Sequence, residues 1–319
     1  MRAVVVVFIT LPEGARHTEY FVRRFGRKYT RRLSDVTYHA FARRESVPAG
    51  VYVFCDRQRM TPDQAALAAH LWDALSAGGD SVRLLNDPRR QLPRYELLKS
   101  LWRVRVNDFD VWRGDGLPEQ IRFPVFVRLS RDHAGARSEL VRDESDLHRV
   151  LAGLMLDGYP AEDLLVEEYL DTSDERGLFR TYAAYRIGDS VFGHSVLQGV
   201  EWSVKNSNRL ATPEAYEEDS AYYYGNPHRD LVAPLFELAG VDFGRVDYSL
   251  AGDRIQVWEI NDNPQFVGPN PRRFSKEPKE LVYIEALDAL SEGLSPGLPI
   301  ALDVFGEGMW ESLQGETSV

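Results

Sequence analysis

The stretch VWEINDNP at residues 257–264 decides how this sequence is interpreted. Successive side chains of a β-strand point to opposite faces, so Glu259 and Asn261 should share one face. Two oxygen ligands on one face suit a hard cation such as Mg²⁺. An exposed polar sheet face is the alternative, but apolar neighbours surround Glu259 and a rigid Asn-Pro pair closes the run. The stretch therefore predicts a strand that carries metal ligands.

The strand before this one should return beside it. Residues 244–261 predict a β-hairpin whose turn is the Gly-Asp pair at 252–253. In such a hairpin Asp247 lies opposite or diagonal to Glu259, with roughly 5 Å between β-carbons in a paired position. Arg245 lies on the same face as Asp247. The hairpin thus predicts two acids, one amide and one arginine on adjacent strands.

The first part of the chain alternates strands with helices. Buried strands are expected at 3–9, 50–55 and 81–85, and helices at 61–77 and 94–102. The first of these helices has a clear start, because Thr61 is a good N-cap and Pro62 suits the first turn. Alternating strands and helices predict an α/β layer with a parallel sheet, which ends near residue 104.

The rest of the chain changes pattern. We expect strands at 124–129 and 164–170, and helices at 146–156 and 281–290. Residues 178–198 predict a second hairpin with a Gly-Asp turn, so the sheet after residue 170 should be antiparallel. Residues 206–228 are polar and rich in tyrosine, which predicts a lid or a partly helical segment. Residues 314–319 are typical of a frayed tail.

The composition bounds the class of protein. The chain has 319 residues, of which 44% are hydrophobic and 27% charged. These values are typical of a globular protein with two domains or three small ones. The single cysteine, Cys55, cannot form an internal disulfide. No apolar run approaches the roughly 20 residues that span a membrane. We therefore expect a cytoplasmic protein without a membrane partner.

The charge is unevenly distributed along the chain. The net charge of −11 argues against nonspecific nucleic-acid binding. Residues 1–128 carry 22 basic and 14 acidic side chains, a balance of +8, and the remainder carries 16 and 35, a balance of −19. Two dissimilar domains would explain this asymmetry. So would a cleft between a basic and an acidic half that holds anionic ligands with the help of metal ions.

An ordered set of motifs resembles the ATP-grasp superfamily, which includes glutathione synthetase and D-alanine–D-alanine ligase. In chain order the motifs are PVFVR at 124–128, the loop at 130–136, VEEYL at 166–170, RVDY at 245–248, and EIN at 259–261 with Pro264. In the same order, the family has a strand that ends in a phosphate contact, a loop that covers phosphate, a strand that holds adenine, and a magnesium-binding pair of strands. The resemblance covers about residues 90–268.

The resemblance implies an α/β (α+β) ATP-grasp fold in three parts. Residues 1–104 would form an N-terminal parallel α/β pre-grasp domain. Residues 105–172 would form a small lobe, and residues 173–319 a large lobe with an antiparallel sheet and the metal site. ATP would bind between the two lobes.

The resemblance also implies an activity. ATP-grasp ligases use ATP and Mg²⁺, for which Mn²⁺ can substitute, to convert a carboxylate into an acyl phosphate that an amine then attacks. The substrates would be a small-molecule carboxylate and amine, and the basic first part of the chain favours an anionic one. Neither nucleic acid nor a membrane is expected as a partner, and the sequence indicates no oligomeric state.

Roles for individual residues follow from the same resemblance. The metal ligands would be Asp247, Glu259 and Asn261. Arg245 would steady the γ-phosphate and the acyl phosphate, and Lys205 and Arg180 are further catalytic candidates. The nucleotide would be held by Lys99, Arg128, Glu167, Glu168, Leu170 and Asp174, with Glu175 competing with Asp174 for the ribose.

Two departures from the family pattern keep rival functions open. Arg128 stands where lysine is usual, and its planar, bidentate guanidinium requires a different geometry around phosphate. The loop at 130–136 has only one glycine and so lacks a glycine-rich phosphate cradle. The rivals are a kinase of the same fold that phosphorylates a hydroxyl, and a nucleotide-binding protein without catalysis.

Overall fold

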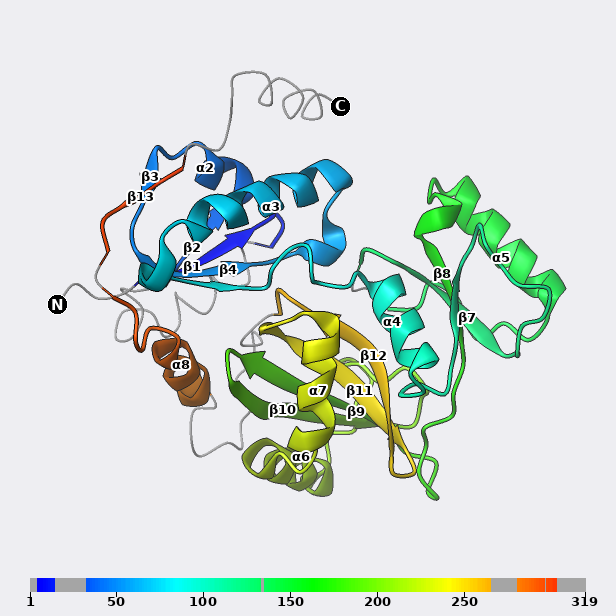
Figure 1. Cartoon of the computed structure of the whole chain (residues 1–319). Helices are drawn as coiled ribbons and strands as arrows, with labels where there is room; N and C mark the ends of the chain where they lie inside the picture. The colour runs from blue at the N-terminus through cyan, green and yellow to red at the C-terminus, as the bar shows by residue number, and fades with distance from the viewer. Residues whose placement is uncertain (1–4, 15–32, 133–134, 265–279, 296, 303–319) are drawn as a thin grey trace.

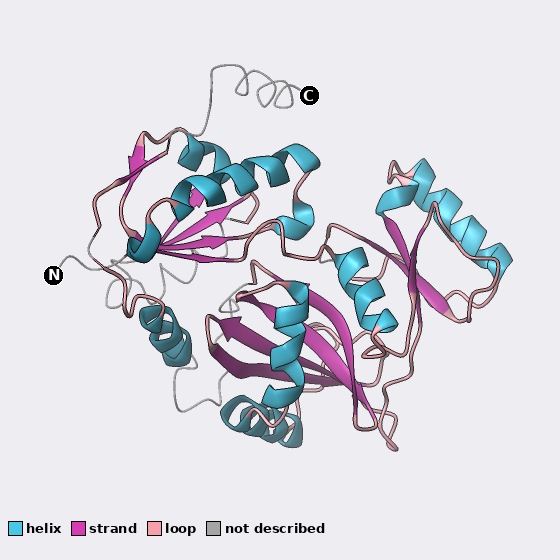
Figure 2. Cartoon of the chain, in the orientation of Figure 1, coloured by secondary structure: helices cyan, strands magenta, loops and turns pink. Residues whose placement is uncertain are grey.

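The structure is a computed structural model that describes residues 5–14, 33–132, 135–264, 280–295 and 297–302. Within these ranges the strands form four sheets, which are grouped into an N-terminal unit, a small unit and a large unit (Figure 1). Figure 2 shows that each of the three units combines strands with helices. No helix in the described ranges is long and apolar enough to span a membrane.

The N-terminal sheet has the order β2-β1-β4-β5, and all of its strands are parallel. Its strands are β1 (Val5–Thr10), β2 (Leu33–Thr37), β4 (Gly50–Phe54) and β5 (Val82–Leu85), with the helices α2 (Tyr38–Ala42) and α3 (Pro62–Ser76). Helix α3 begins where the sequence predicts, because Thr61 and Gln64 form a reciprocal capping box. The predicted parallel α/β layer is therefore confirmed. Strand β2 is an additional edge strand that the sequence pattern did not predict.

The small sheet has the order β6-β8-β7. Its elements are β6 (Val111–Arg113), β7 (Val125–Leu129), β8 (Leu164–Glu168) and the helix α5 (Glu144–Leu156), which begins after the N-cap Asp143. Both strand pairs are antiparallel, so antiparallel pairing begins before residue 170, earlier than predicted. A Gly-Asp turn signal marks only strands that are joined by a tight turn, whereas β7 and β8 are joined through α5.

The two faces of the small sheet have different neighbours. Val125, Val127 and Leu129 pack with α5 in one apolar cluster. Phe126 and Arg128 alternate with them and therefore face the other way. Helix α4 (Arg94–Arg103) packs against this second face, where its leucines join Val111 and Leu165 in a core shared with the large sheet (Figure 1). Arg128 therefore faces the large unit.

The large sheet has the order β10-β9-β11-β12 and is antiparallel throughout. Its elements are β9 (Phe179–Ile187), β10 (Ser190–Gly199), β11 (Phe243–Ala251) and β12 (Arg254–Asn261), with the helices α6 (Pro213–Gly225) and α7 (Arg229–Ala239). Both predicted hairpins are confirmed. Of the two interpretations of residues 206–228, the partly helical one is confirmed, because α6 occupies 213–225.

The C-terminal part of the chain returns to the N-terminal unit. Helix α8 (Glu280–Ala289) packs in a cluster that contains residues of β1, β4 and β9. Strand β13 (Ile300–Ala301) then pairs with β3 (Ser46–Val47). Buried Asn86 adds a polar link, since its amide donates to the carbonyls of Phe54 and Phe243. These contacts fix the N-terminal unit on the large unit. The predicted tail at 314–319 lies outside the described residues.

Candidate nucleotide and metal site

Strands β11 and β12 bring the predicted metal ligands together. Asp247 pairs directly with Glu259, and Arg245 pairs with Asn261. A β-bulge follows, because Asp247 pairs with residue 259 whereas Tyr248 pairs with residue 257. The extra residue in β12 allows Val257 to enter the core while Glu259 faces the site. The prediction that Asp247 lies opposite or diagonal to Glu259 is therefore confirmed, and the bulge separates their face from the core.

Asp247 is held by an arginine of its own strand. Arg245 Nε donates to Asp247 Oδ1 at 2.8 Å, and its Nη2 donates to Oδ2 at 2.7 Å. Burial alone would lower the pKa of Arg245, but the surrounding acidic groups, Asp247 foremost among them, together raise the pKa. The guanidinium stays charged, and the bidentate pair fixes the plane of the Asp247 carboxylate.

Glu259 is held by two arginines from other parts of the chain. Its Oε2 accepts hydrogen bonds from Arg94 Nη2 at 2.6 Å and from Arg128 Nη2 at 2.8 Å. Arg94 begins α4, Arg128 lies on β7, and Glu259 lies on β12. Arg128 thus joins the small sheet to the large sheet, at the place where the resemblance puts the nucleotide. The sequence predicted a site role for Arg128 but not for Arg94.

Arg94 also binds the segment that follows β7. Its Nη1 donates to the carbonyl oxygens of Leu129 at 2.9 Å, Ser130 at 3.2 Å and Asp132. The residue is 1% exposed. Burial, together with the charge of Arg128, lowers the pKa of Arg94 to about 10, and Glu259 opposes the shift. Arg94 therefore remains charged at neutral pH.

Glu167, in the described part of the chain, lacks the hydrogen bonds that Arg94 and Glu259 have. It lies on β8 between Phe126 and Val111, and it is fully buried. Within the described residues neither carboxylate oxygen has a hydrogen-bond partner, and Arg128 Nε is 3.8 Å from Oε1. Burial raises the pKa of Glu167, and the charges of Arg128 and Arg94 limit the rise. Arg128 therefore offsets the charge of Glu167, while the hydrogen-bonding capacity of its carboxylate is not met within the described residues.

The predicted adenine strand is shorter than expected, because β8 ends at Glu168. The side chain of Glu168 is engaged, since its Oε2 accepts from Asp110 N at 3.0 Å and from Arg122 Nη2 at 2.6 Å. Leu170 follows the strand and packs at the margin of the shared core. Both of these contacts of the Glu168 side chain are thus within the protein.

Lys99 lies on α4 outside this cluster. Its Nζ donates to Asp110 Oδ1 at 2.6 Å and to the carbonyl of Val111 at 3.1 Å. The ammonium also lies over the rings of Trp102 and Trp112, at 4.8 and 5.3 Å from their centroids. A phosphate contact, as predicted, would require Lys99 to leave these partners.

Arg180 and Asp174 are brought together at the start of β9. Arg180 Nη1 donates to Asp174 Oδ2 at 2.8 Å, and its Nε donates to Glu218 Oε1 at 2.7 Å. The Arg180 hydrogen bond holds the pKa of the Asp174 carboxyl below its usual range. Asp174 and Arg180 are thus paired with each other, and Arg180 is also paired with Glu218 of α6. Glu175 is exposed to solvent.

Lys205 lies at the loop that the sequence predicts to cover phosphate. A β-carbon added to Gly135 would be 2.9 Å from Lys205 Nζ, and Gly135 has a φ of +87°. Three residues earlier, the ring of Trp202 packs on Phe126 and Tyr169, with centroids 5.0 and 6.1 Å apart. The segment 202–205 of the large unit therefore lies against the small unit. Residues 133–134 of the loop lie outside the described residues.

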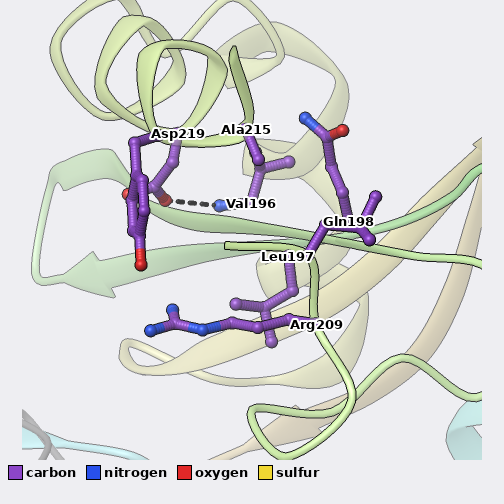
Figure 3. Close-up of a pocket in the computed structure, with 8 residues that line it drawn as sticks. Val196, Leu197, Gln198, Arg209, Ala215 and Asp219 are labelled. Carbon is purple, nitrogen blue, oxygen red and sulfur yellow. Dashed lines mark hydrogen bonds between the residues drawn. The ribbon is translucent and has the colours of Figure 1, made fainter. Parts of the chain in front are cut away.

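A shallow pocket elsewhere in the large unit contains none of the predicted residues. It lies between β10 and α6 (Figure 3), and its lining residues are Val196, Leu197, Gln198, Arg209, Leu210, Ala215, Tyr216 and Asp219. Inside it, Val196 N donates to Asp219 Oδ1 at 2.8 Å. This hydrogen bond satisfies a backbone donor of the edge strand β10, so Asp219 has a structural role here.

The hairpin donors fit a hard cation. Asp247 and Glu259 provide carboxylate oxygens and Asn261 provides an amide oxygen, the donor types that Mg²⁺ and Mn²⁺ accept in proteins. Asn261 Oδ1 also accepts from Asn263 N at 2.9 Å, which orients the amide. In the part of the chain that the structure describes, no group of three or more His, Cys, Asp and Glu residues is arranged for a metal. An ion here would therefore rely on two carboxylates and the amide.

Comparison with known proteins shows the fold. No protein-family model and no curated protein matches the sequence. The D-alanine–D-alanine ligase of Coxiella burnetii matches over 98% of each chain, with 11% identity and a TM-score of 0.52. The Bacillus anthracis enzyme, complexed with ATP, matches over 92% of this chain and 97% of its own, with 10% identity and a TM-score of 0.51. The chain therefore has the ATP-grasp fold that its motifs predict.

Proposed function

We propose that this protein is an ATP- and Mg²⁺-dependent ligase that joins a carboxylate to an amine. The observation that carries the proposal is that Asp247 and Glu259 face each other beside Asn261. Arg128 reaches this group from the small sheet and donates a hydrogen bond to Glu259. Hard oxygen donors and fixed guanidinium groups at one place suit the transfer of a phosphoryl group, where catalysis is mainly positioning and charge stabilisation.

The hairpin residues would hold the metal and the transferred group. Asp247, Glu259 and Asn261 would bind Mg²⁺, which when bound offsets the charge that develops on the phosphoryl group. Arg245 lies beside these donors and would steady the γ-phosphate and then the acyl phosphate. Arg128 would contact phosphate in place of the usual lysine, with a bidentate fork rather than a point charge.

The nucleotide would bind along β8. The carboxylate of Glu167, which has no hydrogen-bond donor within the described residues, would accept a hydrogen bond from the amino group of the base, and the backbone of Glu168 and Leu170 would contact its edge. Lys99 is proposed to contact phosphate and Asp174 to contact the ribose. To do so, Lys99 would leave its ion pair with Asp110, and Asp174 would leave its ion pair with Arg180. Lys205, at the loop after β7, and Arg180 are proposed as further contacts of the reacting groups.

The reaction would proceed in two transfers. An oxygen of the substrate carboxylate forms a bond to the γ-phosphorus while the bond to the β-γ bridging oxygen breaks, giving an acyl phosphate and ADP. The amine nitrogen then bonds to the acyl carbon, phosphate leaves with the bonding electron pair, and the amine loses a proton. Activation is needed because a free carboxylate is a poor electrophile. No covalent protein nucleophile is needed.

A nucleotide-binding protein without catalysis is the second candidate. The observation that favours it is the bond of both Arg94 and Arg128 to the same oxygen of Glu259. If those bonds persist with nucleotide bound, Glu259 serves the interface between the units and Arg128 is not available to phosphate. The intact set of Arg245, Asp247 and Asn261 favours the ligase.

The test is a screen of carboxylates with amines, in which ADP and phosphate release are measured and the products are identified by mass. We expect release that depends on both substrates and is lost in Asp247→Asn. The matched control is Asp253→Asn at the exposed tip of the same hairpin, which should keep the parent rate. A phosphate ester of a hydroxyl, formed without the amine, would identify a kinase instead. Nucleotide binding without ADP release would favour the second candidate.

A further inference from the structure

Arg94 is the largest fully buried side chain in the described part of the chain. A buried guanidinium is unfavourable unless its N–H groups find acceptors and its charge finds a partner. The two terminal nitrogens of Arg94 meet both needs, because Nη2 donates to Glu259 and Nη1 donates to backbone carbonyls. Its burial therefore requires the surrounding groups to keep one arrangement.

The partners of Arg94 belong to two different parts of the site. Glu259 is a proposed metal ligand on β12. The three carbonyls belong to Leu129, the last residue of β7, and to Ser130 and Asp132, which lie in the loop that the resemblance assigns to phosphate. A single planar group therefore binds the metal side and the loop side at once.

The origin of Arg94 makes it a fixed reference. It is the first residue of α4, and Leu97, Leu98 and Leu101 of this helix are fully buried in the core shared by the small and large sheets. Arg128 also binds Glu259, but it lies on β7 of the small sheet rather than on α4. Arg94 is thus the contact that relates both groups to the shared core.

We propose that Arg94 is a positioning residue, which holds the carboxylate of Glu259 and the segment 129–132 in one fixed relation. The proposal rests on the proposed function for its catalytic meaning. Arg94 thereby couples the conformation of segment 129–132 to the position of the Glu259 carboxylate. A substitution that displaces one of these groups should therefore displace the other through the guanidinium.

Arg94→Lys is the informative variant. Lysine keeps the positive charge, but it replaces the planar fork with a single ammonium on a flexible stem, which cannot reproduce all of these contacts. Groups that orient a metal ligand typically change metal affinity by about tenfold to a hundredfold when they are mutated. We therefore expect Mn²⁺ to bind at least roughly tenfold more weakly to Arg94→Lys. The KM for Mg²⁺-ATP should rise more than kcat falls.

The experiment measures two quantities on the full-length chain. Mn²⁺ affinity is measured by electron paramagnetic resonance, and amide hydrogen exchange is measured for peptides that cover residues 129–132. Exchange in Arg94→Lys should be roughly tenfold faster, as for the loss of a charge-assisted hydrogen bond. The control is Arg103→Lys at the exposed end of the same helix, which should change neither quantity. A folded Arg94→Lys with parental metal affinity and parental exchange would overturn the proposal.

A second variant keeps the test decisive if Arg94→Lys does not fold. Glu259→Gln replaces the carboxylate with a neutral amide, which binds Arg94 less strongly. Amide exchange at 129–132 should therefore rise, although the substitution lies on β12. Parental exchange in this variant would overturn the proposal. The exchange measurement needs no nucleotide or metal. A parent that binds neither would therefore refute the proposed function and leave the positioning role of Arg94 still measurable.

Discussion

Two buried glutamates face the space between the small and large sheets, and their surroundings differ. Glu259 accepts hydrogen bonds from two guanidinium groups, whereas Glu167 has no hydrogen-bond partner within the described residues. Both have Arg128 as a neighbour, at 2.8 Å from Glu259 Oε2 and at 3.8 Å from Glu167 Oε1. Hydrogen-bonded arginines thus compensate the charge of Glu259 at the proposed metal end, whereas at the proposed base end Glu167 has only the more distant Arg128 as an ion-pair partner among the described residues.

The difference indicates which end is organised before ligand binding. At the metal end, fixed arginines orient carboxylates that would otherwise repel one another, so the donors need little rearrangement. At the proposed base end, the carboxylate of Glu167 lacks a hydrogen-bond donor within the described residues, so a ligand that donates a hydrogen bond to it should bind more tightly. The nucleobase is therefore expected to gain affinity from Glu167, and the phosphates are expected to gain orientation from the arginines.

The largest effect should follow a change at the metal end. Glu259→Gln should lower kcat by about 10²–10³-fold, the usual loss when a charge-stabilising group is removed from an active site. Stability should fall as well, by up to about 3–5 kcal/mol, because Arg94 and Arg128 lose their buried counter-charge. Steady-state kinetics and urea unfolding measure the two quantities. Parental turnover would contradict the assignment of Glu259 to the metal.

The next largest effect concerns Arg128, the neighbour of both glutamates. Arg128→Ala should weaken binding of a nonhydrolysable ATP analogue by roughly tenfold to a hundredfold, the equivalent of about 1.5–3 kcal/mol for a charge-assisted hydrogen bond. Arg128→Lys should retain part of the affinity, since it keeps the charge and loses the fork. Calorimetric titration provides the affinities. Equal binding by the alanine variant and the parent would transfer the phosphate role to Lys99 or Lys205.

Glu167→Gln should have a smaller effect on affinity and the opposite effect on stability. Loss of the buried negative charge and of one of the two acceptor oxygens should weaken ATP binding by about tenfold. Because the folded-state pKa of Glu167 is raised above 4.5, the folded state binds the proton more tightly. Its contribution to stability is therefore full below pH 4.5 and is lost as the pH rises through the folded-state pKa.

The measurement for this variant is urea unfolding as a function of pH. The free energy of unfolding of the parent should fall with pH in that window more steeply than that of Glu167→Gln. The control Glu162→Gln, at an exposed position, should follow the parent. A variant curve parallel to the parent curve would show that Glu167 finds a donor in solution.

The smallest effect should come from Trp202, which packs over the base end. The chain has 6 tryptophans, so an emission change needs assignment. Addition of Mg²⁺-ATP should change the tryptophan fluorescence of the parent, and Trp202→Phe should remove most of that change. Phenylalanine keeps an aromatic contact with Phe126, so affinity should change by less than about tenfold. A signal that survives in Trp202→Phe would place the reporting tryptophan elsewhere.

The sequence by itself determined the parts of the site that depend on local rules. The Gly-Asp turn marked the hairpin, and a signal of this kind acts over a few neighbouring residues. The register at the turn pairs Ala251 with Arg254 and, continued without interruption, would pair Asp247 with Trp258, so the bulge is what brings Glu259 opposite Asp247. The N-cap of α3 and the strands of the N-terminal sheet followed from equally local signals. The β-bulge beside Asp247 was not predicted, because it depends on which residue of β12 can enter the core.

Only the tertiary structure decided what surrounds these groups. Arg94 is separated from Glu259 by 165 positions, and at the start of an amphipathic helix it looks like any solvated arginine. Its role arises because the shared core fixes α4 between the two sheets, which buries the guanidinium against Glu259. Glu167 differs from Glu168 in the same way, since the pleat of β8 turns one inward without a donor and the other toward Arg122. Burial and long-range charge pairing depend on the packing of whole units, and no local pattern encodes them.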